Sequence, residues 1–487
     1  MKKMLCNIKP ITLSILLFLC VGCQTQIGFV SADSETITFS FSDYSIAASN
    51  SSDSYIIEGT KLTILGAGNY LVTGNCSNGS ITIKKATTGV VLVLKSLELS
   101  CDYSAPILCE EGSDVNLVLS ETSTLTDDKS KVEDETAVIK ADKNSVLTIK
   151  GDGSLNVKAA NNGIASDGSI VISGGNVNVE AGNNGIESDP DYCLGDIMGG
   201  TLTITDGEIT INAEDAAIKA ASMLTIGIKG KSSGPDINVI RSGDGLKAAQ
   251  IYLYSGKGII RSSDDGINAA YKRFTSTDEA DGGYQYADDL YRAFREKFGD
   301  FLIEVDGGTW YVNADGDGLD SNGGIKINGG NITVFGSEGN DDAAIDYENI
   351  FEINEGQIIA IGTSNMAVYP TKTQEAKSYV VFGAKGIVPP SPDDGPEPSV
   401  PDDGPGQDEP VEPEEYGVVV VNGVKDQMSS SLSIKRGDKI VIKDSENNVV
   451  ASATAEKTAN NVMYALTDGD KTYKLYINGV EFSERID

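Results

Sequence analysis

The chain has 487 residues, a length that fits two or three domains or one long repeat array but not a single compact core. With 38 basic and 72 acidic residues, its formal net charge is −34, which argues strongly against binding to the phosphate backbone of nucleic acids. The chain contains no histidine, which excludes serine–histidine–aspartate triads, cysteine–histidine pairs and histidine-ligated zinc.

The N-terminus has the pattern of an export signal. Two lysines precede an apolar run over residues 11–21, which is too short to span a bilayer as a mature helix. Residues 19–23 resemble a bacterial lipobox in which Cys23 receives the lipid, and cleavage after Ala32 is the alternative. Both patterns predict a signal peptide over 1–32 and an exported protein that is either secreted or held at the cell surface. A membrane contact is expected only through such a lipid anchor.

Four cysteines lie outside this leader, and no two of them have CxxC spacing. We interpret them as small buried apolar residues, and a disulfide between Cys101 and Cys109 is the alternative. The four are Cys76, Cys101, Cys109 and Cys193.

An internal repeat runs through residues 34–388. Acidic, amide or small residues precede a glycine or alanine and then Ile or Leu, except in an early, degenerate copy over residues 137–139. The base spacing is about 22 residues, and insertions lengthen it. The Ile or Leu of each copy is called the marker below. The markers are Ile139, Ile164, Ile186, Ile218, Leu246, Ile267, Leu319 and Ile345.

One copy, residues 163–182, shows how such a repeat would fold. Alternating apolar and polar residues predict strands at 164–166, 169–173 and 176–180, with glycine-containing turns between them. Three short strands cannot close a core alone, but stacked coils can, with each strand pairing in parallel with its equivalent about 4.8 Å away. The sequence therefore predicts an all-β fold, a three-sided parallel β-helix.

Three segments depart from the repeat. Residues 271–300 form an insertion rich in Tyr and Phe, which we interpret as a flap over one face or, alternatively, as an aromatic platform for sugar rings. Residues 389–415 are an acidic, proline-rich linker without Lys or Arg. Residues 416–487 read as a small all-β unit that either caps the repeat or folds as a separate module.

Carboxylates stack in the later coils of the repeat. Two carboxylates about 5 Å apart repel each other by roughly 3 kcal/mol, so protonation, nearby lysines or a bound cation must offset the repulsion. Calcium is the natural cation, because it accepts about six to eight oxygen ligands in flexible geometry, although capping of turns explains any single Asp equally well. The candidate calcium ligands are Asp244, Asp264, Asp265, Asp315, Asp317, Asp320, Asp341, Asp342 and Asp346.

Basic residues beside these carboxylates open a catalytic alternative. A polysaccharide lyase would use calcium to neutralise a uronate carboxylate and a Lys or Arg as the base, but the same basic residues can simply balance the Asp charges. We therefore assign no catalytic residue. The candidate ligand-binding residues are Lys247, Arg261, Tyr284, Tyr286 and Trp310.

Four segments resemble a bacterial family of exported carbohydrate-binding β-helix proteins, and the resemblance covers roughly residues 34–379. The family is known for binding cellulose and polygalacturonate, and its fold is similar to that of pectate lyases. The resemblance implies a right-handed β-helix, calcium held by the acidic residues and no established enzymatic activity. The segments are 264–270, 315–323, 344–347 and 362–367.

From these features we expect an exported calcium-binding protein that binds polysaccharide, such as polygalacturonate or cellulose, without catalysis. A pectate-lyase-like enzyme and a structural or adhesive surface protein are the alternatives. The sequence leaves the oligomeric state open.

Overall fold

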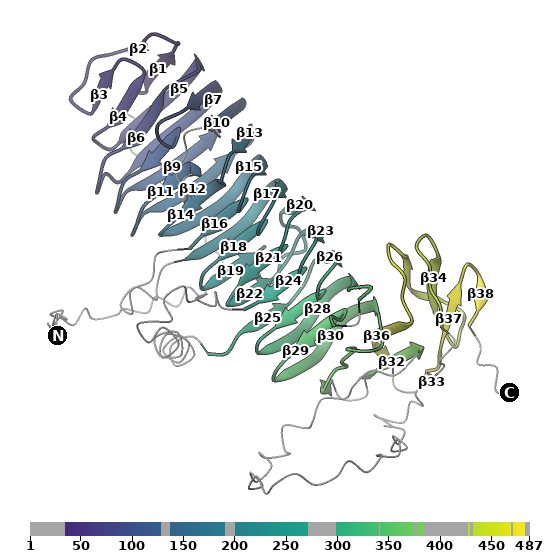
Figure 1. Ribbon diagram of the computed structural model, residues 1–487. Coiled ribbons are helices and arrows are strands. Elements are labelled where there is room, and N and C mark those ends of the chain that lie inside the picture. Colours follow the sequence, from purple (N-terminus) through teal and green to yellow (C-terminus); the bar gives the residue numbers. More distant parts are fainter. Residues whose placement is uncertain are drawn as a thin grey trace, which may run out of the picture. The chain divides into compact units, whose positions relative to one another are not determined.

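Strands joined by turns and bends make up the described part of the chain, which contains no helix (Figure 1). The all-β prediction is therefore confirmed for these residues, and none of them forms a helix that could cross a membrane. The structure is a computed structural model, and from Thr36 onward its described residues belong to one compact unit. It describes residues 35–127, 137–189, 200–270, 299–339, 341–374, 377–383, 427–428, 432–468 and 471–482.

A 12-stranded sheet contains the markers. Its strands are mostly three to five residues long, and all but the first pair run parallel. In chain order they are β3 (Tyr55–Glu58), β4 (Lys61–Ile64), β6 (Ser80–Ile83), β8 (Ile107–Cys109), β11 (Ala137–Ala141), β14 (Asn162–Ser166), β16 (Ile186–Ser188), β18 (Ile218–Ala220), β21 (Leu246–Ala248), β24 (Ile267–Ala269), β27 (Leu319–Ser321) and β29 (Ile345–Tyr347).

A 22-stranded sheet forms the rest of the coils. Its strands are β1 (Ile37–Phe41), β2 (Ile46–Ala48), β5 (Gly68–Cys76), β7 (Val90–Cys101), β9 (Asp114–Leu119), β10 (Thr122–Asp127), β12 (Val146–Gly151), β13 (Ser154–Ala159), β15 (Ser169–Ala181), β17 (Thr201–Ala213), β19 (Met223–Ile226), β20 (Asp236–Arg241), β22 (Gln250–Leu253), β23 (Lys257–Ser262), β25 (Leu302–Val305), β26 (Thr309–Ala314), β28 (Gly324–Phe335), β30 (Ile350–Gly362), β31 (Lys372–Thr373), β32 (Lys377–Gly383), β33 (Gln427–Met428) and β36 (Asn461–Asp468).

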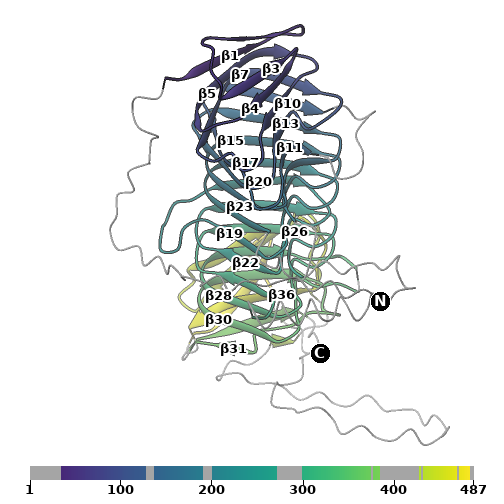
Figure 2. The ribbon, with the colours of Figure 1, turned by 90° about the vertical axis from the view of Figure 1, so that its left-hand side faces the viewer.

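Successive coils stack with equivalent residues in register (Figure 2). All eight markers pair directly from one strand of the 12-stranded sheet to the next, including across the long insertion between Ile267 and Leu319. The markers are almost completely buried, and each contributes about 1.5–3 kcal/mol of hydrophobic stabilisation. The repeat therefore sets which outward side chains lie side by side.

The prediction of a three-sided right-handed β-helix is wrong. Parallel pairing runs from β17 through β19, β22 and β25 to β28 and returns through β26, β23 and β20, which closes an eight-stranded parallel barrel. The physical reason is visible at Gly174 and Gly175, where the sequence predicts a turn. Their positive φ angles of 156° and 90° bend the chain while the strand continues, so two expected strands are the single strand β15.

The C-terminal residues contribute to two sheets. Strand β36 pairs antiparallel with both β30 and β32 and so extends the large sheet. A separate four-stranded sheet lies within the segment predicted as a small all-β unit. Its members are β34 (Lys439–Asp444), β35 (Val449–Thr454), β37 (Tyr473–Ile477) and β38 (Val480–Glu481).

The described cysteines are buried and free, so the alternative of a Cys101–Cys109 disulfide is wrong. Several other predictions concern residues that the structure does not describe. These are the signal peptide with Cys23, Cys193, the insertion over 271–298 with Tyr284 and Tyr286, and the linker over 389–415.

Candidate metal centre and binding groove

Two side-chain positions recur in every coil of the 12-stranded sheet. The cap position lies two residues before the marker, and the outer position directly follows the marker and faces away from the core. Because the strands pair in register, outer residues of successive coils lie side by side about 4.8 Å apart. From β11 to β29 the outer residues are Lys140, Ala165, Glu187, Lys219, Lys247, Asn268, Asp320 and Asp346.

The cap position has a structural task. Its side-chain oxygen accepts a hydrogen bond from the backbone N–H at the cap position of the next coil. Asn and Asp perform this task equally well, so the fold alone does not require a carboxylate there. The pairs are Asn162 with Asn184 at 3.1 Å, Asn184 with Ala216 at 3.1 Å, Asp265 with Asp317 at 2.9 Å, and Asp317 with Ala343 at 2.5 Å.

Cap and outer residues of the same coil form complementary pairs in the earlier coils. Asn184 donates to Glu187, Lys247 forms a 2.5 Å ion pair with Asp244, and Asn268 donates to Asp265 at 2.6 Å. Each pair joins a donor to a carboxylate.

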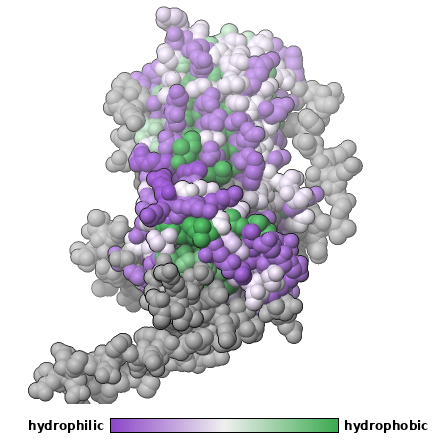
Figure 3. All heavy atoms as spheres, turned by 90° about the vertical axis from the view of Figure 1, so that its right-hand side faces the viewer, coloured by the Kyte–Doolittle hydropathy of each residue, from purple (hydrophilic) through white to green (hydrophobic). Residues whose placement is uncertain are grey.

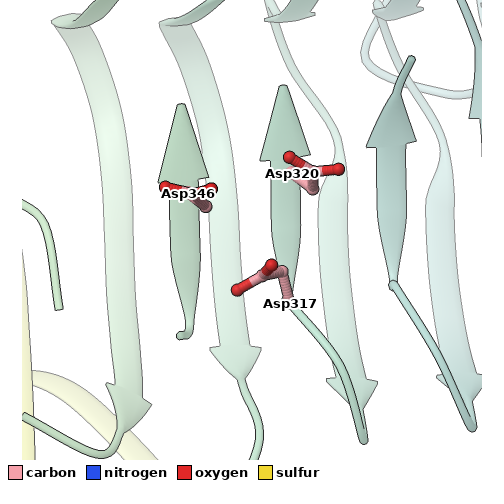
Figure 4. A group of neighbouring side chains, drawn as sticks. All are labelled: Asp317, Asp320 and Asp346. Carbon is pink, nitrogen blue, oxygen red and sulfur yellow. The ribbon is translucent and has the colours of Figure 1, made fainter. Parts of the chain in front are cut away.

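The coil of β27 breaks this rule, because Asp317 at its cap position meets Asp320 at its outer position. Asp346 is the partner of Asp320 on the neighbouring strand β29. One carboxylate oxygen from each of these three residues lies within 4.8 Å of the others (Figure 4). No basic residue in the described part of the chain forms an ion pair with any of the three, so this acidic triad is where a cation fits best.

Burial and mutual repulsion raise the pKa values in the triad. Burial is the largest cause for Asp317 and Asp320, and neighbouring carboxylates add to it, which brings their pKa values to about 7 and about 8. Burial also raises the pKa of Asp346, and that of the adjacent Asp265 to about 6. Raised pKa values mean that the charged forms lack a compensating positive charge.

The other candidate ligands do not converge on the triad. Asp244 is held by Lys247, and the exposed Asp315 forms a 2.7 Å ion pair with Lys457. Asp264 and Asp341 are exposed and Asp342 is half-buried. Burial and the nearby Asp244 raise the pKa of Asp264.

The described candidates for ligand binding occupy three different settings. Lys247 is committed to its ion pair with Asp244. Trp310 is only 1% exposed, and its indole N–H donates to the carbonyl of Gly307 at 2.8 Å, so its ring offers no face to a sugar. Arg261 lines a cleft of 380 Å³ beside the C-terminal residues.

A groove that the sequence analysis missed follows the outward face of β10, β13, β15 and β17. Its volume is 440 Å³, and Thr124, Asn156, Asn178 and Thr210 lie in register along it. Asn178 donates to Asn156 at 3.2 Å, so the amides form a ladder across coils. The signal was present in the sequence as an Asn between two apolar residues at the same place in two successive copies.

The groove and the cleft meet at Ile240, which lines both and is 53% exposed. The strands carrying them are labelled along the right-hand side of Figure 1, and Figure 3 views the molecule from that side. Hydrophilic residues dominate this face and hydrophobic patches interrupt them. Such a mixture suits a sugar polymer, which offers hydroxyl groups and apolar ring faces together.

A family model and a solved structure match parts of this chain. Residues 58–196 match a family model described as a carbohydrate-binding domain-containing protein, and this range includes Asn156 and Asn178 of the groove. The chain is also similar to a solved structure titled as a polysaccharide lyase-like protein from C. thermocellum, gadolinium derivative. That similarity has 20% identity and a TM-score of 0.36, and it covers 66% of this chain and 99% of the other. No curated protein matches the chain.

Proposed function

We propose that this protein is an exported, calcium-binding protein that holds a polysaccharide without cleaving it. The family match over residues 58–196 supports a carbohydrate ligand. The main evidence for calcium binding is the acidic triad of Asp317, Asp320 and Asp346. In earlier coils the equivalent cap and outer positions pair a hydrogen-bond donor with a carboxylate instead.

The spacing of the triad suits calcium. Calcium binds oxygen at about 2.3–2.6 Å, so two ligands on opposite sides of one ion lie roughly 5 Å apart, and the triad oxygens all fall within 4.8 Å of one another. A divalent cation there replaces the repulsion between Asp317 and Asp320 with attraction to a shared charge. The half-buried setting excludes part of the water that would otherwise weaken this attraction.

Three carboxylates leave part of a calcium coordination shell for other oxygens. Because Asp320 and Asp346 face outward, those remaining positions are open to a ligand from solvent. A uronate carboxylate from an acidic glycan, such as polygalacturonate, would complete the shell. Calcium bridging thus explains how a protein with a net charge of −34 could hold an acidic polymer.

Binding without cleavage agrees with the setting of Lys247, which forms an ion pair with Asp244. A lyase base must reach a proton on the sugar, whereas the ammonium group of Lys247 is engaged with Asp244. We therefore favour the binding function over the lyase alternative.

A pull-down on insoluble polygalacturonate and on cellulose tests the proposal. Each polymer is incubated with the wild-type protein in millimolar calcium or in excess chelator. Asp320→Asn removes one triad charge, and Asp53→Asn removes an exposed charge elsewhere as the matched control. The proposal expects retention on polygalacturonate that chelator and Asp320→Asn weaken and Asp53→Asn preserves. Equal retention in calcium and chelator would reject calcium bridging.

A further inference from the structure

The three arginines of the described residues, Arg241, Arg261 and Arg436, all line the 380 Å³ cleft, together with Lys457. We call this the arginine cleft. The chain has 38 basic and 72 acidic residues, yet in this cleft four basic residues outnumber three carboxylates. Arg241 ends β20 and Arg261 lies in the neighbouring strand β23, so the two side chains reach the same cleft.

The carboxylates that line the arginine cleft already have partners. Asp315 pairs with Lys457 at 2.7 Å, which uses the charge of that lysine. Glu338 accepts hydrogen bonds from the backbone N–H and the hydroxyl of Thr458, at 2.6 and 2.8 Å. Glu456 accepts a hydrogen bond from Asn313 at 2.6 Å.

The arginines consequently keep donors to spare. Arg261 is 3.7 Å from Glu456, and Arg241 is 3.4 Å from Glu214, which is itself largely exposed. Arg436 forms no ion pair within 4.0 Å in the described part of the chain. Each guanidinium carries five N–H donors in a planar fork that matches the oxygens of a carboxylate or sulfate.

The cleft continues into the groove through their shared residue, Ile240. A chain lying along the Asn and Thr side chains of the groove reaches the arginines at its end. We propose that the arginine cleft is a subsite for an anionic group on the bound polysaccharide, either a uronate carboxylate or a sulfate ester. This inference rests on polysaccharide binding but not on calcium, because the cleft supplies its own positive charge.

The test uses the full-length protein in excess chelator, so that calcium bridging does not contribute. Affinity electrophoresis measures binding to gels that contain polygalacturonate, a sulfated polysaccharide or neutral hydroxyethyl cellulose. Arg261→Gln/Arg436→Gln removes two cleft charges. The matched control is Lys257→Gln/Lys439→Gln, which removes two charges from strands β23 and β34. These lysines are close in sequence to the two arginines but do not line the cleft.

We expect the arginine variant to lose about tenfold or more in affinity for an acidic polymer, while the lysine control changes less than about twofold. Loss toward polygalacturonate alone identifies a carboxylate, and loss toward the sulfated polymer alone identifies a sulfate. Equal losses in both double variants, or no binding of any acidic polymer by the wild type in chelator, would overturn the inference. Neither result touches the calcium proposal, which the Asp320→Asn pull-down decides separately.

Discussion

Asp320 on β27 lies directly opposite Asn268 on β24, and the two residues occupy the same outer position of consecutive coils. Asn268 donates a hydrogen bond to Asp265 at 2.6 Å, whereas Asp320 faces Asp317, to which a carboxylate has no hydrogen to donate. One change of residue type therefore replaces an amide–carboxylate hydrogen bond with two facing carboxylates. The preceding coil shows the same place with an amide donor at the outer position.

This relationship predicts the behaviour of Asp320→Asn. The new amide should donate to Asp317 as Asn268 does to Asp265, so the calcium-free protein should become more stable by about 1–3 kcal/mol. The variant should also lose the increase in unfolding temperature that calcium gives the wild type. Thermal unfolding with calcium and with chelator measures both effects. A variant that keeps the full calcium-induced increase would place the ion elsewhere.

The raised pKa values predict how stability depends on pH in chelator. The folded-state pKa values of Asp265, Asp317 and Asp320 are about 6, 7 and 8, above the ordinary value of 3.8. Between these limits the folded state binds more protons than the unfolded state, so stability falls as pH rises from about 4 to 8. Denaturant midpoints at pH 5, 6.5 and 8 check this trend, and Asp320→Asn should flatten it.

The affinity for calcium should depend on pH in the opposite direction to the stability of the calcium-free protein. Because carboxylate ligands must lose their protons to bind metal, affinity for calcium should rise over the same pH range. Calorimetric titrations at pH 5.5 and pH 8 test this point. Equal affinity at the two values would mean that the triad does not supply the ligands.

The groove gives a prediction that is independent of the metal. Asn156→Ala/Asn178→Ala removes the amide ladder and should lower polysaccharide affinity about tenfold, because each lost hydrogen bond costs about 0.5–1.5 kcal/mol. Calcium-induced stabilisation should remain. Asn116→Ala, on β9 and outside the groove lining, is the control. Unchanged affinity in the double variant would exclude the groove as the binding face.

The bend in β15 predicts a cost for adding a side chain there. In Gly175→Ala the new Cβ would lie 2.7 Å from Cδ1 of Leu119 at a φ of 90°, so we expect destabilisation by about 1–3 kcal/mol. Gly59 also has positive φ, at 64°, but no atom lies within 4 Å of its added Cβ. Chemical unfolding of the two alanine variants separates the effect of the close contact with Leu119 from the effect of positive φ. Equal losses of unfolding free energy in the two variants would show that the contact contributes nothing.

The sequence predicts which residues of successive coils pair with one another better than it predicts where each strand begins and ends. The spacing of the markers identifies which residues pair, even between Ile267 and Leu319, because a buried aliphatic residue in every coil is a strong periodic signal. The same pattern suggests a turn at Gly174 and Gly175, although these glycines bend one continuous strand. A glycine with positive φ suits both a turn between two strands and a bend within one strand, so glycine alone does not distinguish the two.

The site is predictable only in part for a similar reason. Counting acidic residues selects nine candidates, but only the register shows that Asp317, Asp320 and Asp346 converge while Lys247 and Lys457 engage Asp244 and Asp315. Lys457 lies far along the chain from Asp315, so local sequence carries no trace of this pairing. The single tryptophan looks like a sugar platform by residue type, but Trp310 fills the core above Gly258.

Titration of calcium into the chelator-stripped, full-length protein tests the central claim most directly, with the wild type and Asp320→Asn measured side by side at pH 8. Our account predicts that the wild type binds one more calcium ion than the variant. Identical stoichiometry and affinity in the two proteins would contradict it.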